Sequence, residues 1–597
     1  MLRTHTCWEL TSKNIWEEVI LSWRVNKNRN LWWLYFIDLR DRYWLTQVAI
    51  DPNSSQLKNT IPNLESFLQE IKSEYVLQIK WKVVSRPSDM INKNMPSWEI
   101  EIQPTHIEIL SKSNVLPFPI VDDPNTSEEN RFKHRFLDLR RRPVLKNLEF
   151  RTKMAKFTRD WFTDRDFLEI QTPIFTVSSP EWARDYLIPS RVNPGKFYAL
   201  PQAPQQYKQL LMVGGIDKYF QIAPCFRDED PRADRHSCEF YQIDCEMSFV
   251  EQEDIYQVVE SFMKDMVSTL VPHKKITTNF IKMKYVDAID KYGTDKPDLR
   301  FAMEFVDMTQ EFKNSEFSVF HNVANMPRWS IKAINFQNKI LSRKEIDELT
   351  KIAQEAKAKW LAYISFTEEW TQGSIAKFFK ESEINSIKSK LNVKDWDTIL
   401  FIADEYNIAT KAMNKVRLAI RDKYNLVNND DLSFLWIEDF PMFEKDEETG
   451  KLDFAHNPFS NIKWWLNALQ TEDIMNLETT QYDLILNGFE SLSGSIRNHD
   501  PEVLLKVFQL AGLGEKEIKE KFGAMYNAFQ YWAPPHGWFA LWFDRIMMIL
   551  LDEENIRECY AFPKSGKAED VMMGAPWFID QATLDELWIT IKTPKEK

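Results

Sequence analysis

The sequence predicts an α+β protein of several domains, and three observations support this class. Short strand-like runs such as LYFIDLRD, LTQVAI and VLQIKWKVV alternate with turns in residues 1–108. A highly charged loop joins two further strand-like runs between Leu200 and Glu246. Amphipathic helical patterns mix with strands in residues 299–433. With 597 residues, the chain is long enough to bury several separate cores.

Residues 1–108 are expected to form a small β-barrel of the OB-fold type, because their strand-like runs are short and separated by turns. Residues 109–142 are polar, contain prolines and are predicted to be a linker. In the barrel, Phe36 could stack on a base, and Arg29 and Gln47 could contact base edges or phosphates. A core phenylalanine with two surface polar residues is an equally good interpretation.

A helix is predicted from Pro143 to about Thr163, because proline suits the first helical turn and apolar residues recur at helical spacing. The run FLEIQTPIFT after it is expected to be a strand ending at Pro173. The predicted order is then one half of a large domain, an inserted α/β domain, and the second half with a C-terminal tail. These three segments are residues 143–298, 299–433 and 434–597.

The loop FRDEDPRADRHSCEF is the segment richest in candidate chemistry. So many charges are unfavourable in a hairpin loop unless the loop binds a charged partner. Arg227 directly follows an apolar strand and Phe240 opens the return strand, which suits a phosphate held beside a stacked purine. The alternative is a solvated surface loop, as most charge runs are. We expect the active site here.

This arrangement resembles motif 2 of the class II aminoacyl-tRNA synthetases. PEWARDYLIPSRVNPGKFYALPQAPQQYKQLLM, DEDPRADR and QIDCEMSF resemble the bacterial-type aspartyl enzymes of that class. The resemblance runs from THTCWEL to AFPKSGKAEDVMMGAP and covers nearly the whole chain. It implies an anticodon-binding OB-fold, a catalytic domain built on an antiparallel sheet with helices, and a bacterial-type insertion domain. The predicted helix at residues 143–163 and the strand-like run after it resemble motif 1 of the class, which implies a homodimer interface. Simple packing of this helix in a core is an equally good interpretation.

The activity implied by the resemblance is that of an aspartate–tRNA ligase. L-aspartate and ATP would give aspartyl-adenylate, and the aspartyl group would pass to the 3′ end of tRNA(Asp), with Mg²⁺ as cofactor. One alternative is a catalytically inactive, synthetase-like RNA-binding protein. Another is a relative that also charges tRNA(Asn), although Leu31 stands where many enzymes of relaxed specificity carry histidine.

The resemblance also assigns roles to single residues. Arg227 would bridge the reacting carboxylate and the α-phosphate, and Arg545 would hold the γ-phosphate. Residues matched to ATP binding are Arg227, Asp228, Glu229, His236, Phe240, Glu490, Trp542, Phe543, Asp544 and Arg545. Residues matched to aspartate binding are Glu181, Gln205, Lys208, Arg227, Asp244, His456 and Arg497. A lone histidine such as His236 is more often structural, and each of the others could be a surface or salt-bridge residue.

Asp483 and Glu490 flank the run DLILNGFE and match the carboxylates that bind magnesium in the family. In one straight strand, residues seven apart point to opposite faces, so a shared metal would require a bend or bulge. Gly488 permits such a bend. Solvated or paired acids are the alternative interpretation.

Charge and composition exclude several other classes. The net charge of −13 is unfavourable for long-range attraction to RNA, so contact with tRNA must use local basic patches. No run of 18 apolar residues exists and MLRTHTCWEL has no apolar signal region, so we expect a cytoplasmic protein that contacts no membrane. The five scattered cysteines argue against disulfides and a zinc site.

Tryptophan and glycine occur in unusual numbers. The chain has 22 tryptophans and 14 glycines, whereas roughly 42 glycines are usual for this length. Trp360 is expected at a left-handed helix end and Trp396 in a turn, where glycine is favoured. We predict that Trp182, Trp538, Trp542 and most turn tryptophans are glycines encoded by UGA, and that Trp161 and Trp436 are genuine core residues. An aromatic-rich protein with ordinary buried indoles is the alternative.

Overall fold

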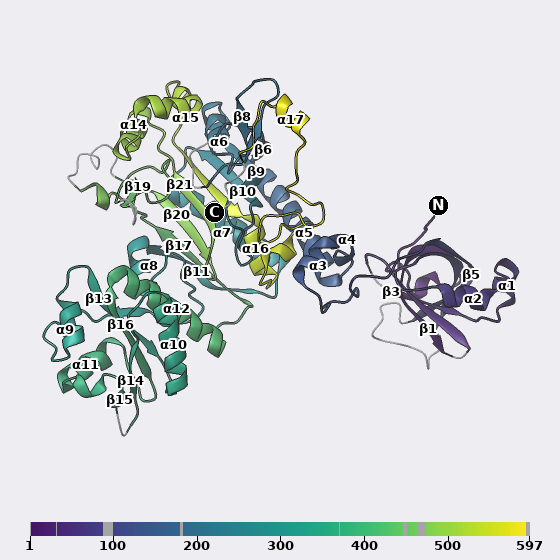
Figure 1. The fold of residues 1–597 in the computed structure, drawn as a ribbon, viewed down its shortest axis with the longest axis horizontal. Helices are drawn as coiled ribbons and strands as arrows, with labels where there is room; N and C mark the ends of the chain where they lie inside the picture. Colours follow the sequence, from purple (N-terminus) through teal and green to yellow (C-terminus); the bar gives the residue numbers. More distant parts are fainter. Residues whose placement is uncertain are drawn as a thin grey trace. The chain divides into compact units, whose positions relative to one another are not determined.

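The computed structural model describes residues 2–31, 33–43, 45–86, 99–178, 183–368, 371–445, 450–463 and 473–592. The chain divides into two units, Met1–Lys146 and Asn147–Lys597. The first unit contains a closed barrel, and the second contains an eight-stranded and a separate five-stranded sheet (Figure 1). The predicted fold class is therefore confirmed.

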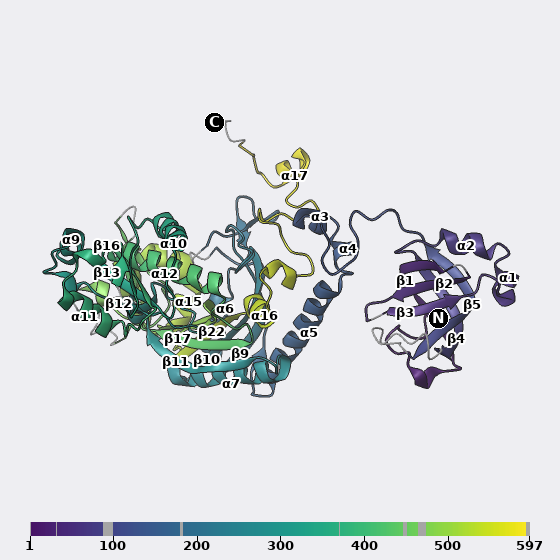
Figure 2. The ribbon, with the colours of Figure 1, turned by 90° about the horizontal axis from the view of Figure 1, so that it is seen from below.

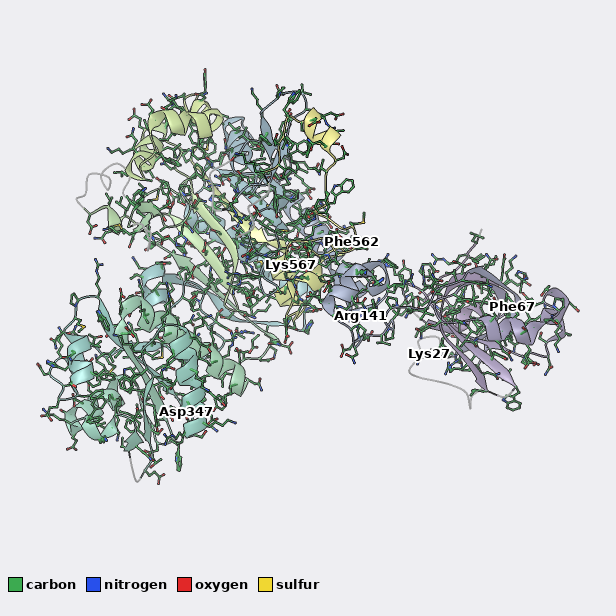
Figure 3. All side chains as sticks on the ribbon, viewed as in Figure 1. Lys27, Phe67, Arg141, Asp347, Phe562 and Lys567 are labelled. Carbon is green, nitrogen blue, oxygen red and sulfur yellow. The ribbon has the colours of Figure 1, made fainter. Side chains whose placement is uncertain are left out.

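The barrel of the first unit has the strand order β1-β2-β3-β5-β4. Its core consists of alternate strand residues such as Val48 and Ile79, together with leucines of two short helices, and Phe67 of the second helix packs against this core (Figure 3). The elements are β1 (Glu18–Leu31), β2 (Leu34–Arg40), β3 (Leu45–Ile50), α1 (Ser55–Thr60), α2 (Leu64–Glu70), β4 (Val76–Ser85) and β5 (Ile100–Ser111). The predicted linker contains α3 (Glu128–Lys133) and α4 (Arg135–Asp138).

The large sheet of the second unit has the order β11-β17-β20-β21-β22-β10-β9-β6. Neighbouring strands are antiparallel except for the parallel pairs β11 with β17 and β6 with β9. Its strands are β6 (Leu168–Glu169), β9 (Lys218–Phe226), β10 (Glu239–Ser248), β11 (Lys275–Lys284), β17 (Asp431–Glu438), β20 (Gln481–Leu486), β21 (Phe489–Ile496) and β22 (His536–Trp542). The strand predicted to end at Pro173 is wrong in its extent, because only two of its residues join the sheet.

Helices α5 (Arg142–Thr163) and α7 (Gln252–Leu270) cover one face of this sheet (Figure 2). Together with α16 (Phe543–Leu550) they enclose the largest apolar core, which contains Phe162, Phe262 and Trp436. The helix predicted to begin near Pro143 is therefore confirmed. The opposite face of the sheet carries the polar side chains described below.

The second sheet has the order β12-β13-β16-β14-β15 and belongs to the inserted α/β segment. Its elements are β12 (Phe305–Asp307), α9 (Ser318–Ala324), β13 (Trp329–Phe336), α10 (Arg343–Glu355), β14 (Ala362–Phe366), β15 (Thr371–Gly373), α11 (Glu381–Lys390), β16 (Thr398–Glu405) and α12 (Tyr406–Tyr424). Ser342 and Glu345 form the expected capping box of α10. The left-handed residue after this helix is Lys357 and not Trp360, which corrects the sequence prediction.

The other regular elements complete the second unit. They are β7 (Leu187–Pro189), β8 (Phe197–Ala199), α6 (Gln205–Val213), α8 (Tyr285–Tyr292), β18 (Phe443–Lys445), β19 (Leu452–Phe454), α14 (Pro501–Leu510), α15 (Glu515–Phe529) and α17 (Gln581–Glu586). Short 3₁₀ turns cover Ser12–Asn14, Gln310–Phe312, Ala376–Phe378, Ile474–Asn476 and Ile556–Cys559. Among the residues described, no helix has the length and apolar character needed to span a membrane.

Candidate active site

Strands β9 and β10 form the hairpin predicted from the sequence, and the charged loop connects them. Phe226 pairs with Glu239 at its end, and the backbone N–H of Arg227 donates to the carbonyl of Cys238 at 2.8 Å. Arg227 therefore leaves the sheet from a fixed backbone position. Its guanidinium carbon lies 5.1 Å from the centre of the Phe240 ring on the return strand.

A first cavity of about 270 Å³ lies beside this loop. It is lined by Arg227, Glu229, Arg235, His236, Phe240, Lys296, Gly488, Phe489, Glu490, Trp542 and Arg545. Arg545, in the first turn of α16, donates through Nε to the carbonyl of Arg235 at 3.2 Å. Burial lowers the pKa of Arg545 to about 10, and burial also lowers the pKa of His236. The cavity wall thus carries several cations beside aromatic rings, which suits a polyanion with an aromatic group.

A second cavity of about 180 Å³ shares Arg227, Glu490 and Trp542 with the first. Its other lining residues are Ala203, Gln205, Gln242, His456, Asn457, Gln481, Asp483, Ser493, Trp538 and Ala540. The ring of His456 packs edge-on against Phe440 at 4.7 Å, and burial lowers its pKa. Two small cavities that share a wall can hold two reactants side by side, with Arg227 next to both.

A buried charge cluster lies beside the second cavity. Lys208 donates to Asp244 at 2.6 Å and lies 3.5 Å from Glu246. Arg497 donates to Glu246 at 3.0 Å and to Gln205 at 2.8 Å. Gln205 and Lys208 are one turn apart on α6, and Asp244 and Glu246 are two apart on β10, so each pair faces the same side of its element.

The two carboxyl groups of this cluster titrate differently. Burial, opposed by the ammonium of Lys208, raises the pKa of Asp244 to about 6. Burial alone would also raise the pKa of Glu246, but Arg497 and Lys208 lower it below its usual value. Glu246 is therefore the fixed anion of the cluster, and Asp244 is the group whose charge depends on its surroundings.

Several buried polar atoms at this site have no hydrogen-bond partner in the part of the chain that the structure describes. They are Gln205 Nε2, Arg227 Nε, Asp244 Oδ1, Asp483 Oδ1 and Arg497 Nη1. An unpaired buried polar atom is unfavourable by about 1–3 kcal/mol, and groups of them occur where a ligand supplies the partners. Three donors, two of them on guanidinium cations, and two carboxylate acceptors thus remain available to a small zwitterionic molecule with a second negative group.

Asp483 and Glu490 lie on the neighbouring strands β20 and β21 rather than on one bent strand, which corrects the sequence interpretation. Asn487 and Gly488, both with positive φ, form a two-residue hairpin turn between Leu486 and Phe489. A bulge after Leu484 shifts the register, and both carboxylates reach the second cavity. The Asn-Gly pair was the signal in the sequence that could have predicted this hairpin.

The electrostatics of this acidic pair are strongly unequal. Burial and the charge of Glu490 raise the pKa of Asp483. Burial alone would raise the pKa of Glu490, but the charges of Lys296 and Arg545 lower it to about 2. Lys296 donates to Glu490 at 2.9 Å. Within the described ranges of the chain, no three His, Cys, Asp or Glu side chains are grouped so as to hold a metal ion.

Some predicted residues lie elsewhere. Asp228 lies 3.7 Å from Arg184 and does not line either cavity. Asp544 pairs with Arg151 and accepts a hydrogen bond from the backbone N–H of Tyr241 at 2.8 Å, so both of its carboxylate oxygens already have partners within the protein. Phe543 is buried in the apolar core. Predicted Glu181 and Trp182 fall outside the described residues.

Sequence reasoning missed two charged residues of the site. Glu246 could have been found, because it is a second carboxylate two positions after Asp244 and therefore on the same face of a predicted strand. Lys296 had no such signal, because its partner Glu490 lies 194 residues later in the chain. Each supplies the counter-charge that keeps an opposing site residue ionised.

The barrel brings together the three residues predicted to contact nucleic acid. Arg29 and Phe36 are paired across β1 and β2. Arg29 donates to both oxygens of Asp38 at 2.8 and 2.9 Å, and Gln47 donates to Asp38 at 3.3 Å. Asp38 therefore holds a cation and an amide beside a half-buried aromatic ring on one face of the barrel.

Comparison with known proteins identifies relatives over the whole chain. The sequence model of the family "tRNA synthetases class II (D, K and N)" matches residues 127–566. An aspartate–tRNA(Asp/Asn) ligase of Chlorobium phaeovibrioides is 44% identical over 596 residues, covering 100% of this chain and 97% of its own length. An aspartate–tRNA ligase of Streptomyces avermitilis is 43% identical over 598 residues, covering 100% and 99%.

Two solved structures share the fold. The aspartyl-tRNA synthetase of Entamoeba histolytica has a TM-score of 0.56 at 18% identity, covering 94% of this chain and 91% of its own. An asparaginyl-tRNA synthetase of Pyrococcus horikoshii, complexed with asparaginyl-adenylate, has a TM-score of 0.56 at 17% identity, covering 95% and 99%. At this level of identity, the two structures support the fold alone.

Proposed function

Because the chain belongs to the class II tRNA synthetases for aspartate, lysine and asparagine, we infer that it is an aspartate–tRNA ligase. The enzyme activates L-aspartate with ATP to aspartyl-adenylate and then transfers the aspartyl group to the 3′ end of tRNA(Asp). Its full-length relatives carry the names aspartate–tRNA ligase and aspartate–tRNA(Asp/Asn) ligase.

The observation that carries this function is the set of unpaired polar atoms at the second cavity and in the charge cluster beside it. Arg497 Nη1 and Lys208 supply positive charge for a side-chain carboxylate, and Asp244 Oδ1 accepts from an ammonium group. Gln205 Nε2 offers a further donor. An acidic amino acid satisfies these atoms, whereas the uncharged amide of asparagine would give Arg497 Nη1 no anionic partner. His456 orders the wall of this cavity.

The first step of the reaction is favoured by the shared wall between the two cavities. An oxygen of the substrate α-carboxylate attacks the α-phosphorus of ATP, a new phosphorus–oxygen bond forms, and pyrophosphate leaves. Arg227 borders both cavities and has an unpaired Nε, so its guanidinium is suited to bridge the attacking carboxylate and the α-phosphate. This chemistry needs positioning and charge neutralisation more than a protein nucleophile.

The remaining residues of the first cavity suit the rest of ATP. The ring of Phe240, which stacks on the Trp542 indole in this structure, would stack on the purine in its place, and Glu229 offers an acceptor for the purine amino group or for the ribose. Arg545 is charged and buried, as required of a residue that holds the γ-phosphate. His236 lies in the same wall, and its lowered pKa keeps it neutral near pH 7, so it would act as a hydrogen-bonding group.

Asp483 and Glu490 fit a magnesium ion brought in with ATP. They offer carboxylate oxygens, one of them unpaired, and their mutual repulsion favours a cation between them. Magnesium is commonly held by one or two carboxylates together with phosphates and water, so a third protein ligand is not required. When bound, the ion would neutralise charge on the phosphates. Lys296 keeps Glu490 ionised before the ion arrives.

Recognition of tRNA(Asp) is proposed to use the barrel. The pairing of Arg29 and Gln47 around Asp38 beside Phe36 supports base and phosphate contacts by these three residues. Relatives named for tRNA(Asp) alone and for both tRNAs are about equally similar to this chain. Leu31 favours strict choice of tRNA(Asp).

We also propose that the enzyme works as a homodimer in the cytoplasm, where tRNA is charged for translation. Leu168, Ile174, Phe175 and Val177 follow α5 and are exposed, with Phe175 at 60%. Exposed apolar residues in and shortly after the two-residue edge strand β6 suit contact with a second copy.

The function is tested with the protein as its native host makes it, by aspartate-dependent ATP-pyrophosphate exchange measured across the amino acids. Exchange with aspartate alone is expected, followed by aminoacylation of tRNA(Asp) and not of tRNA(Asn). Exchange with asparagine or lysine in place of aspartate would refute the assignment. Charging of tRNA(Asn) with aspartate would retain the ligase but reject its strict choice of tRNA.

A further inference from the structure

We propose that positions 538 and 542 are glycine in the working enzyme, and that the indoles written there occupy the spaces of the aspartate side-chain carboxylate and the purine. The inference rests on the proposed function, because that function says which groups those spaces receive. It is carried by the contacts of the two indoles and, independently, by the backbone at four other tryptophans.

Trp542 lies where an aromatic base would stack. Its ring is parallel to that of Phe240, with 4.8 Å between centroids and 27° between planes. The guanidinium carbon of Arg545 lies 4.3 Å from the centroid of the same indole ring, and that of Arg227 lies 5.2 Å from it. The indole Nε1 donates to Glu490 at 3.2 Å.

A purine and an indole are both flat, fused bicyclic rings that carry N–H groups at their edge. The indole of Trp542 therefore makes the stacking, cation–π and hydrogen-bond contacts that a bound adenine requires. A nucleotide and this side chain cannot occupy the same space, so ATP cannot stack on Phe240 while the indole remains there.

Trp538 fills the corresponding place at the second cavity. Lys208 Nζ lies 4.3 Å from the centre of its indole ring, and the guanidinium carbon of Arg497 lies at 4.4 Å. The electron-rich face of the ring attracts both cations. These are the two cations that the substrate carboxylate needs, and the indole is only 8% exposed, so it cannot swing into solvent without rearrangement of the wall.

The backbone gives a separate indication. Trp16, Trp396, Trp532 and Trp588 have φ of 76°, 73°, 73° and 54°. This left-handed region is disfavoured for residues with a β-carbon and is used mainly by glycine. All four side chains are also more than half exposed, which is unusual for the largest aromatic residue.

Other tryptophans behave as ordinary core residues. Trp436 is fully buried and stacks on Tyr256 with 4.1 Å between centroids. Trp161 packs against Phe262 at 5.1 Å and donates to Asp265 at 2.8 Å. Trp161 and Trp436 thus have the contacts of core tryptophans, whereas the backbone at Trp16, Trp396, Trp532 and Trp588 is of the kind that favours glycine. Two codons, UGG and UGA, would produce this division.

The codons and the native protein test the inference directly. UGA is expected at positions 16, 396, 532, 538, 542 and 588, with UGG at 161 and 436. Peptide mass spectrometry of the native protein is expected to find glycine at 538 and 542. UGG codons there, or native peptides that contain tryptophan at these two positions, would overturn the proposal.

Recombinant variants test whether the two indoles occupy the spaces of the purine and of the aspartate side-chain carboxylate. ATP-Mg²⁺ binding by titration calorimetry and aspartate-dependent pyrophosphate exchange are measured for the chain as written, for Trp542→Gly, for Trp538→Gly and for both together. Trp542→Gly is expected to strengthen ATP binding by about a hundredfold, and exchange should require both changes. Trp436→Gly is the matched control and should lower the thermal unfolding temperature without gain of binding.

The results separate this inference from the proposed function. If the chain as written binds ATP as tightly as Trp542→Gly and exchanges pyrophosphate with aspartate as fast as the double variant, the inference is rejected and the ligase assignment stands. If the double variant gains ATP binding but exchanges with no amino acid, the purine space is supported and the ligase assignment is rejected. If the double variant does not fold, ATP binding by Trp542→Gly still tests the purine space, and aspartate binding by Trp538→Gly still tests the ligase assignment.

Discussion

Arg497 Nε lies 3.0 Å from Glu246 Oε1, and both side chains are completely buried. Glu246 holds the guanidinium in place by this contact. Nη1 of the same group has no hydrogen-bond partner among the described residues, and Nη2 donates to Gln205, which lines the second cavity. One arginine therefore serves both the fold and the substrate. Substitutions at this site must be designed so that the two contributions can be separated.

The first prediction concerns the variant Arg497→Leu. This variant and all those below are made in the protein that also carries Trp538→Gly and Trp542→Gly. We expect the KM for aspartate to rise at least about a hundredfold with the KM for ATP nearly unchanged, because the substrate group that this guanidinium would contact is the side-chain carboxylate of aspartate. Steady-state pyrophosphate exchange measures both constants. Equal loss of ATP and aspartate affinity would make Arg497 purely structural.

The same variant should also lose stability. Glu246 then keeps Lys208 at 3.5 Å, and His536 at 3.9 Å adds little positive charge near pH 7 because burial lowers its pKa to about 4. Removing one partner of a buried ion pair typically costs about 3–5 kcal/mol. Adding Glu246→Gln to Arg497→Leu should restore part of the free energy of unfolding without restoring aspartate activation. Restored activation in that double variant would contradict the role of Arg497 in binding.

Arg227→Ala is expected to abolish adenylate formation. A charge-assisted contact to both reacting anions in the transition state contributes several kcal/mol, so exchange should fall by at least about a hundredfold. Arg191→Ala, which removes an exposed arginine 3.7 Å from Glu586, is the matched control and should exchange normally. Near-normal exchange by Arg227→Ala would refute the bridging role.

Much of this fold and site follows from local sequence patterns. The alternation of β9 and β10 and the helical spacing of Gln205 and Lys208 are properties of adjacent residues, so the sequence could predict them. The hairpin between Asp483 and Glu490 was also encoded locally by Asn487 and Gly488, but the run was interpreted as one strand.

Other features depend on contacts between distant segments. The pairing of Lys296 with Glu490 and of Arg497 with Glu246 forms only when strands from different parts of the chain meet. No local pattern reports such a pairing, because the residues are 194 and 251 positions apart. The extent of β6 was mispredicted for a similar reason, since strand length depends on the neighbour that is available.

Aspartate binding should depend on pH through Asp244. Burial raises its pKa to about 6, so the carboxylate is charged above this pH and becomes neutral as the pH falls through it. The neutral form cannot pair with the substrate ammonium, so kcat/KM for aspartate should fall by up to about tenfold for each pH unit below 6. ATP affinity should lack this step. Asp244→Asn should have low aspartate affinity at every pH, and a pH profile identical to the parent would contradict the assignment.

Glu490→Gln should raise the Mg²⁺ concentration needed for half-maximal pyrophosphate exchange, because one of the two carboxylates that face the phosphates loses its charge. We expect a shift of about tenfold or more, with partial recovery of rate at high Mg²⁺. Glu438→Gln, a carboxylate near Tyr256 that lines neither cavity, serves as control. An unchanged Mg²⁺ dependence in Glu490→Gln would remove this residue from the metal site.

The barrel and the two cavities belong to different units of the chain, so tRNA recognition and amino acid activation should respond to separate substitutions. Arg29→Ala and Gln47→Ala each remove a donor held by Asp38, and a lost base or phosphate contact is worth about 1–3 kcal/mol. Each should therefore lower kcat/KM for tRNA(Asp) by about 5- to 150-fold while aspartate-dependent exchange without tRNA stays at the parent rate.

Lys58→Ala removes one exposed positive charge from α1 of the same unit and should change neither value much. If Lys58→Ala and Arg29→Ala reduced aminoacylation equally, the effect would be general electrostatics, and the proposed contacts on this face of the barrel would be wrong.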